Sequence, residues 1–166
     1  MQEDLGGLFS TELKENYCAA VKDVGIGIPT ELAPLKGAYF NSGVMLLNLK
    51  KMREDGVREK LYRYRAEGFN RFMDQDAFCM VFRGRVLFLP VRYNLLYTLY
   101  KFIPFETVSS QYEVSVSDKR TLLDDAAIIH LCSREKPWRV RVPLFSALFL
   151  RCYPHIPHGR NPVSPA

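Results

Sequence analysis

The sequence predicts an α/β fold, and three observations support this prediction. Short apolar runs typical of buried strands alternate with charged segments whose apolar residues recur at helical spacing. The composition, 48% hydrophobic and 25% charged residues, is that of a globular domain and excludes wholesale disorder. The length of 166 residues fits one domain or part of a larger one.

Two strands are expected in the first third of the chain. Residues 17–21 form a short apolar run between glycines. Residues 44–49 follow Gly43 as a near-continuous apolar run, which predicts a strand buried on both faces of a parallel sheet.

A charged helix is expected over residues 50–67, because its apolar positions recur every three to five residues and form one stripe. These positions are Leu49, Met52, Val57, Leu61 and Tyr64. Gly68 is expected to stop this helix. Asp74 is expected to cap a second helix, over residues 75–82, which closes at Gly84.

The remaining elements follow the same alternation. The pattern predicts strands at residues 86–90 and 126–132, a helix at 117–123 and a closing amphipathic helix at 144–153. We therefore expect one domain over residues 1–153 and a loose C-terminal tail over residues 154–166, which is rich in proline.

Charge and cysteine usage limit the partners and the compartment. The net charge of +5 suits an anionic partner such as a phosphate, a lipid head group or nucleic acid. The cysteines (Cys18, Cys79, Cys132 and Cys152) are widely spaced without a C-x-x-C pair, so we expect free thiols in a reducing, cytoplasmic compartment. No apolar run approaches the roughly 20 residues of a membrane span, and no secretory signal is expected.

Candidate site residues gather at predicted strand ends and helix starts, where open α/β sheets bind ligands. Asn41 belongs either to a plain turn or to an amide that faces sugar hydroxyls. Asp74 and Gln75 begin a helix, where acids favour the helix dipole even without a ligand. His130 either satisfies a backbone carbonyl or binds a metal, and Lys136 is either solvated or neutralises a phosphate.

Four ordered motifs resemble those of the retaining glycosyltransferases of family 8. They are YFNSGVMLLNLKKMRE (residues 39–54), DQDAF (74–78), RYN (92–94) and HLCSREKPW (130–138). The resemblance spans residues 4–153. It implies a GT-A fold with a nucleotide-sugar site at the strand ends and a divalent cation, Mn²⁺ or Mg²⁺.

The resemblance also implies roles for single residues. His130 is the implied metal ligand, Lys136 contacts the diphosphate, and Ser133 stands where the family usually has a glycine near the diphosphate. Asn41 and Asp74 are expected to bind the donor sugar.

Two further roles follow from the same resemblance. Gln75 lies near the anomeric carbon, so that Asp74 and Gln75 form the expected catalytic pair. Cys132 borders the acceptor.

One departure from the family concerns the metal. The segment DLGGLF (residues 4–9) resembles the stretch that follows the family's D-x-D aspartates. Asp74 and Asp76 do not replace those aspartates, because the family has both motifs. We therefore expect the C-terminal part of a GT-A fold, without its nucleotide-binding half, and cation binding only in a complete enzyme.

The leading hypothesis is a retaining hexosyltransferase. It moves glucose or galactose from a UDP-sugar to a saccharide or glycolipid acceptor, as in lipopolysaccharide or cell-surface glycan synthesis. One alternative is an inactive remnant, or a subunit that completes a partner's site. Another is a basic module at the inner face of the membrane, where helix 144–153 and its flanking arginines contact anionic lipid. Nucleic acid is not expected, because no Lys/Arg run is present.

Overall fold

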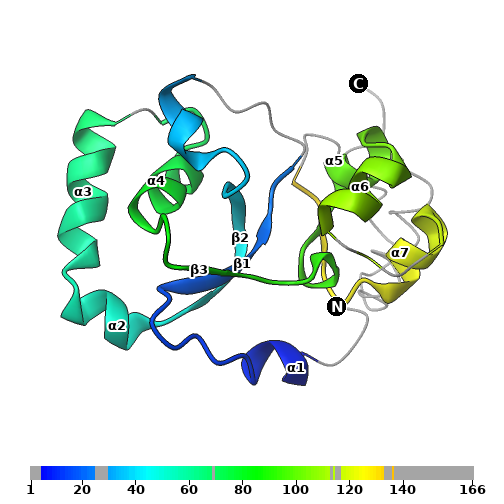
Figure 1. Ribbon diagram of the computed structural model, residues 1–166, viewed down its shortest axis with the longest axis horizontal. Helices are drawn as coiled ribbons and strands as arrows, with labels where there is room; N and C mark the ends of the chain where they lie inside the picture. The colour runs from blue at the N-terminus through cyan, green and yellow to red at the C-terminus, as the bar shows by residue number, and fades with distance from the viewer. Residues whose placement is uncertain are drawn as a thin grey trace, which may run out of the picture.

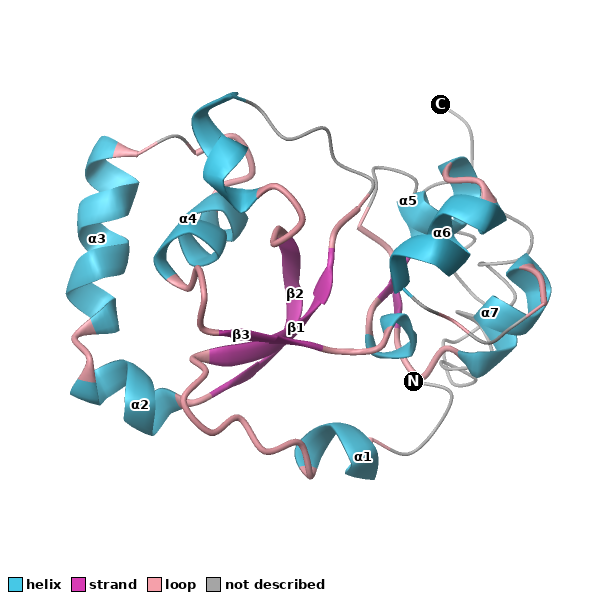
Figure 2. Cartoon of the chain, in the orientation of Figure 1, coloured by secondary structure: helices cyan, strands magenta, loops and turns pink. Residues whose placement is uncertain are grey.

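The computed structural model describes residues 5–24, 30–68, 70–112, 114, 117–132 and 136. Its described part is mixed α/β, as predicted. A three-stranded sheet of order β2-β1-β3 is flanked by helices, and a separate two-stranded sheet pairs β4 with β5 (Figures 1 and 2).

Strand β1 (Cys18–Lys22) is the centre of the larger sheet and confirms the first predicted strand. It pairs antiparallel with β2 (Phe40–Leu47) and parallel with β3 (Val86–Phe88). Alternate residues point to opposite faces of a strand. Accordingly, Ala19 and Val21 belong to one buried cluster, and Cys18 and Ala20 belong to another.

The prediction for the second strand was correct in place but wrong in its environment. Strand β2 begins at Phe40, and its pairing with β1 is antiparallel. Only its first two residues are buried, and Leu47 is 36% exposed. Within the described residues β2 pairs on one edge alone, and its apolar residues from Val44 to Leu47 are half-buried or exposed.

The predicted helix over residues 50–67 is divided into α2 (Leu49–Glu54) and α3 (Val57–Glu67). Gly56 separates them with a φ of 59°, a left-handed conformation that favours glycine. Helix α2 is capped by Asn48, whose side chain accepts the Lys51 N–H at 3.1 Å. Gly68 ends α3 as predicted.

Helix α4 (Asp74–Val81) covers the face of the sheet that carries Cys18, together with the 3₁₀ helix η1 (Thr30–Leu35). The predicted capping role of Asp74 is wrong, because Asp74 is the first helical residue and Met73 precedes it. Gly84 lies in the following turn with a φ of 76°.

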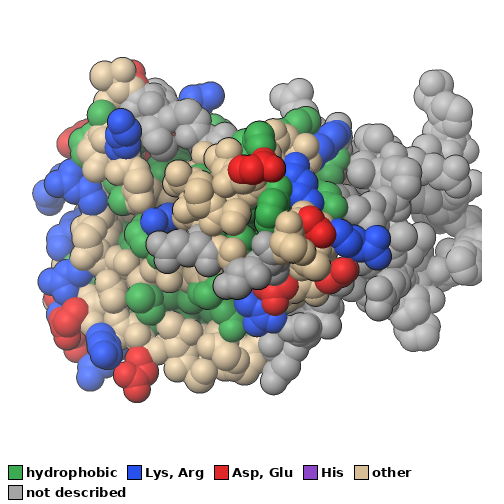
Figure 3. Space-filling model, turned by 45° about the vertical axis from the view of Figure 1, so that its right-hand side comes forward, with side chains coloured by type: hydrophobic (Ala, Val, Ile, Leu, Met, Phe, Trp, Pro, Cys, Tyr) green, Lys and Arg blue, Asp and Glu red, His purple; other side chains and the backbone are tan. Residues whose placement is uncertain are grey.

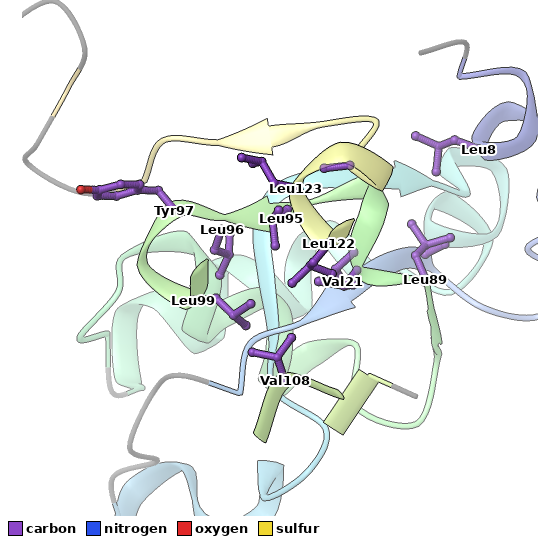
Figure 4. Packing of buried hydrophobic residues seen from close by; sticks show 13 residues of the cluster. Leu8, Val21, Leu89, Leu95, Leu96, Tyr97, Leu99, Val108, Leu122 and Leu123 are labelled. Carbon is purple, nitrogen blue, oxygen red and sulfur yellow. The ribbon is translucent and has the colours of Figure 1, made fainter. Parts of the chain in front are cut away.

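The other face of β1 is covered by the second half of the chain. Its elements are η2 (Val91–Tyr93), β4 (Leu95–Leu96), α5 (Tyr97–Phe102), α6 (Phe105–Tyr112), α7 (Lys119–Asp125) and β5 (Ile129–His130). The short helix α1 (Gly6–Phe9) adds Leu8 to the same core. Figure 4 shows Leu95, Leu99, Val108 and Leu122 from four of these elements converging on Val21 of β1.

Two predictions in this half were correct in type but not in extent. The helix expected at 117–123 begins two residues later, because Asp118 and Thr121 form a capping box. The strand expected at 126–132 is reduced to β5, and the strand expected at 86–90 to β3. Helix 144–153 and the tail 154–166 lie outside the described residues. No described helix has the length and apolarity needed to cross a bilayer.

Candidate functional site

A pocket of about 640 Å³ is lined by residues from five separate parts of the chain. They come from the end of β1, from β2, from the turn into α4, from the β4–α5 segment and from β5 with the residues that follow it. The lining residues are Asp23, Asn41, Ser42, Gly43, Arg71, Phe72, Met73, Asp74, Gln75, Leu96, Thr98, Leu99, Phe102, Ile103, His130, Cys132 and Lys136.

Six of the seven site residues predicted from the sequence line this one pocket. They are Asn41, Asp74, Gln75, His130, Cys132 and Lys136. The seventh, Ser133, lies outside the described residues. The structure therefore brings together segments that are far apart in the sequence.

The carboxamide of Gln75 is buried, 7% exposed, and fully engaged. Its Oε1 accepts the backbone N–H of Ser42 at 3.1 Å and Nδ2–H of Asn41 at 3.0 Å. Because a backbone N–H can only donate, this contact fixes which end of the Gln75 amide is oxygen. Its Nε2 then donates to Asp23 at 3.3 Å.

Asn94 joins this network to His130. The backbone N–H of Gly43 donates to Asn41 Oδ1 at 3.0 Å, and Asn94 Nδ2 donates to the same oxygen at 3.0 Å. The Oδ1 of Asn94 therefore faces His130 Nδ1, at 3.1 Å, and accepts a hydrogen bond from Nδ1–H. In a neutral imidazole the lone pair is then on Nε2.

The surroundings of His130 favour this neutral form. Burial, and secondly the positive charge of Lys136, lowers the pKa of the imidazole. The Lys136 ammonium donates to the carbonyl of Leu131, which holds it next to β5.

The two carboxylates of the D-Q-D motif have different positions. Asp74 faces the pocket, and its Oδ2 accepts the Ser42 hydroxyl at 3.3 Å. Asp76 is fully buried and accepts the Tyr39 hydroxyl and the Phe72 N–H. Asp76 therefore ties the turn before α4 to the residue that precedes β2, whereas Asp74 lines the open pocket.

Sequence reasoning missed two buried members of the site, Asp23 and Asn94. Asp23 accepts from the amides of both Asn41 and Gln75. It follows the apolar run of β1, so its place at a strand end was a usable signal. Asn94 lies within the RYN motif, but its contacts to Asn41 and His130 come from the tertiary fold.

The described residues do not form a complete metal site. His130 Nε2 offers one lone pair, but no group of three or more His, Cys, Asp or Glu side chains in the described part could hold a cation. Mn²⁺ and Mg²⁺ prefer several oxygen ligands. Among the described residues, His130 alone therefore does not suffice to hold such a cation.

The pocket suits a polyhydroxylated ligand. Its lining combines carboxylate and amide groups, which bind hydroxyls directionally, with Leu96, Leu99 and Phe102, which can pack against the apolar face of a sugar ring. Lys136 adds a positive charge to the lining, which suits an anionic substituent.

Three comparisons relate this arrangement to known proteins. The lipopolysaccharide 1,2-glucosyltransferase of Escherichia coli is 30% identical over 95% of this chain and 47% of its own length. The crystal structure of galactosyltransferase LgtC in complex with donor and acceptor sugar analogs has a TM-score of 0.62 and 26% identity, covering 82% of this chain and 50% of LgtC. The glycosyltransferase GlyE of Streptococcus pneumoniae has a TM-score of 0.59 and 27% identity, covering 81% of this chain and 32% of GlyE.

The chain thus spans about half the length of the E. coli relative and of LgtC. The sequence profile of "Glycosyl transferase family 8" matches residues 1–141. This match covers most of the chain and all four motifs. The chain belongs to glycosyltransferase family 8.

Proposed function

We propose that this chain provides the sugar-binding part of a retaining hexosyltransferase site. The donor is a UDP-sugar that carries glucose or galactose, and the acceptor is a saccharide or glycolipid of lipopolysaccharide or another cell-surface glycan. The observation that carries this proposal is the convergence of six predicted residues and the buried amide network on one pocket.

The hydrogen-bond network supports different roles for the residues of the pocket. The amides of Asn41 and Gln75 are fixed by backbone N–H groups, so they form a rigid wall for the donor sugar. Asp74 is free to accept a sugar hydroxyl and to stabilise positive charge on the ring during transfer. Gln75, an engaged amide, is suited to positioning rather than to nucleophilic attack.

Lys136, which also lines the pocket, would neutralise part of the diphosphate, with Ser133 nearby in sequence. Cys132 is exposed beside Thr98 and would border the acceptor. His130 would present Nε2 to a divalent cation whose remaining ligands come from a part of the enzyme that this chain does not contain. When bound, that cation would neutralise the diphosphate leaving group.

The chain spans about half the length of the E. coli relative, so the experiment supplies the other half from that relative. The 166-residue chain is mixed with, or fused to, the N-terminal half of the E. coli glucosyltransferase, and UDP release from UDP-glucose and UDP-galactose is measured with Mn²⁺. We expect metal-dependent turnover by the combination, little UDP binding by the chain alone, and loss of turnover in His130→Ala.

Two results would contradict parts of the proposal. Tight Mn²⁺-dependent UDP binding by the 166-residue chain alone, measured by calorimetry, would show that no other part is needed. Turnover that is unchanged in His130→Ala would remove His130 from the metal site.

A further inference from the structure

A second hollow of about 610 Å³ lies between α2, α3 and the start of α4. Its floor is apolar, and arginines stand on its rim, so we name it the arginine groove. It is lined by Leu49, Met52, Arg53, Gly56, Arg58, Glu59, Leu61, Tyr62, Arg65, Asp74, Ala77 and Phe78. Asp74 lines both this groove and the pocket of about 640 Å³ that is proposed to bind the donor sugar (the sugar pocket), so the two hollows adjoin.

The three arginines of the groove are exposed, and their charges outnumber those of the two carboxylates in its lining, Glu59 and Asp74. Within the described part of the chain, no carboxylate lies at ion-pair distance from Arg53, Arg58 or Arg65. Arg58 lies 5.5 Å from the ring centroid of Tyr62, one turn further along α3. A guanidinium group that has no carboxylate partner can donate two parallel hydrogen bonds to two oxygens of a phosphate.

The surface around the groove is also basic. Residues 49–67 carry seven Lys/Arg and four Asp/Glu. Figure 3, which is turned by 45° from the view of Figure 1, shows blue side chains with several red ones along the left-hand edge of the molecule. Beside these charges Leu49 is 54% exposed and Tyr62 is 63% exposed, and both line the groove.

We propose that the arginine groove docks the chain on an anionic bilayer. The arginines contact lipid phosphates, and the exposed Tyr62 and Leu49 enter the interface with lipid acyl chains over the groove floor. The arginines favour an anionic partner, and the mainly aliphatic side chains of the groove floor favour contact with hydrocarbon chains. A free phosphate would leave that floor exposed to water, and a nucleic acid would find only one exposed aromatic ring in the groove on which to stack.

This surface is distinct from residues 144–153, and the proposal does not depend on the transfer reaction. Because the groove adjoins the sugar pocket at Asp74, a bilayer held there would lie next to that pocket. A membrane-anchored molecule could then reach the pocket without leaving the bilayer.

The test is co-sedimentation of the 166-residue chain with vesicles of phosphatidylcholine, with and without phosphatidylglycerol. We expect binding only when phosphatidylglycerol is present. The double variant Arg58→Glu/Arg65→Glu should weaken that binding at least about thirtyfold, since each basic residue near such a surface contributes about 1 kcal/mol.

The matched control is Lys60→Glu/Arg63→Glu, which makes the same charge change on α3 outside the groove. All four side chains are exposed, and far-UV circular dichroism checks that the variants fold. We expect the control to bind several times more tightly than the groove variant. Tyr62→Ser, which removes no charge, should also weaken binding.

Equal losses in the two double variants would show general attraction to a basic surface and overturn the groove. Vesicle binding that is unchanged in Tyr62→Ser would remove the apolar contact from the proposal. Binding of inorganic phosphate as tight as that of the vesicles would replace the bilayer by a simple anion site.

Discussion

The imidazole of His130 lies directly against the Cα of Gly43. A β-carbon placed on Gly43 would overlap His130 Cε1 and lie 2.7 Å from Nδ1 and 2.9 Å from Nε2. The glycine of the N-S-G segment is therefore required for space, because any side chain there would occupy the place of the ring. The same residue donates its N–H to Asn41, so one glycine both orients the amide network and admits the histidine.

Gly43→Ala should lower the free energy of unfolding by about 1–3 kcal/mol, as the displaced ring breaks its hydrogen bond to Asn94. Replacing a strand glycine by alanine normally stabilises by about 0.5–1 kcal/mol, so the sign of the effect is informative. Urea unfolding of a double-mutant cycle with His130→Ala measures the coupling. In the His130→Ala background the clash is absent, and Gly43→Ala should be neutral or stabilising. Additive effects would contradict the contact.

Asn94→Leu should change the tautomer of His130. The variant keeps the branched shape and the number of side-chain heavy atoms but removes the acceptor for Nδ1–H, so the proton should move to Nε2. Imidazole ¹⁵N chemical shifts report this change directly. Asn70→Ala, which changes an exposed asparagine whose amide donates to the Arg65 and Gly68 carbonyls, is the control and should leave the ring shifts as they are. An Nε2–H tautomer already present in the unmodified chain would refute the assignment.

Asp74→Asn and Gln75→Ala should distinguish a residue whose charge supports turnover from a residue that mainly stabilises the site. In the combined enzyme proposed above, Asp74→Asn should lower turnover by about 10²–10³-fold, as for other charge-stabilising groups, with little change in the melting temperature. Gln75→Ala should lower turnover less, about tenfold, but should also destabilise the fold by about 1–3 kcal/mol, because Asn41 and Asp23 lose partners. Steady-state kinetics and thermal melts measure both. Equal turnover of Asp74→Asn and the unmodified enzyme would remove Asp74 from the chemistry.

Thiol labelling should distinguish Cys132 from the core cysteines. Burial raises the pKa of the Cys18 and Cys79 thiols to about 12, whereas Cys132 is exposed at the pocket. In a Cys152→Ser background, N-ethylmaleimide at pH 7.5 should label one cysteine of the folded chain and three in urea. Mass spectrometry of tryptic peptides identifies the site. Rapid native labelling of Cys18 would show that the strand at the centre of the sheet is accessible.

The sequence predicted correctly those elements that have strong local signals. The apolar run before Asp23 predicted β1, and the glycine after Glu67 predicted the end of α3. The division of the long charged helix at Gly56 was not predicted, because one apolar stripe continues through Leu49, Val57 and Leu61 on both sides of the break. The left-handed backbone at Gly56 becomes visible only in three dimensions.

The candidate site was partly predictable for a related reason. Asn41, Asp74 and His130 belong to motifs with a recognisable order, so a resemblance identifies them. Asn94 and Asp23 act through amide contacts to residues far away in the sequence, and no local pattern encodes such contacts. The environment of β2 was also misjudged, because an apolar run does not specify how many neighbours the strand will have.

The long reach of the Asn41–Asn94 hydrogen bond has a consequence for folding kinetics. These two residues are 53 positions apart, and Gln75 and Asp23 are 52 apart. Closing such loops costs entropy that only the assembled core repays, so helices such as α3 should form early and the amide network late. Partly folded chains would then hold helical structure without a binding pocket. A sugar ligand, which can bind only the completed pocket, should accordingly slow unfolding and leave the rate of folding almost unchanged.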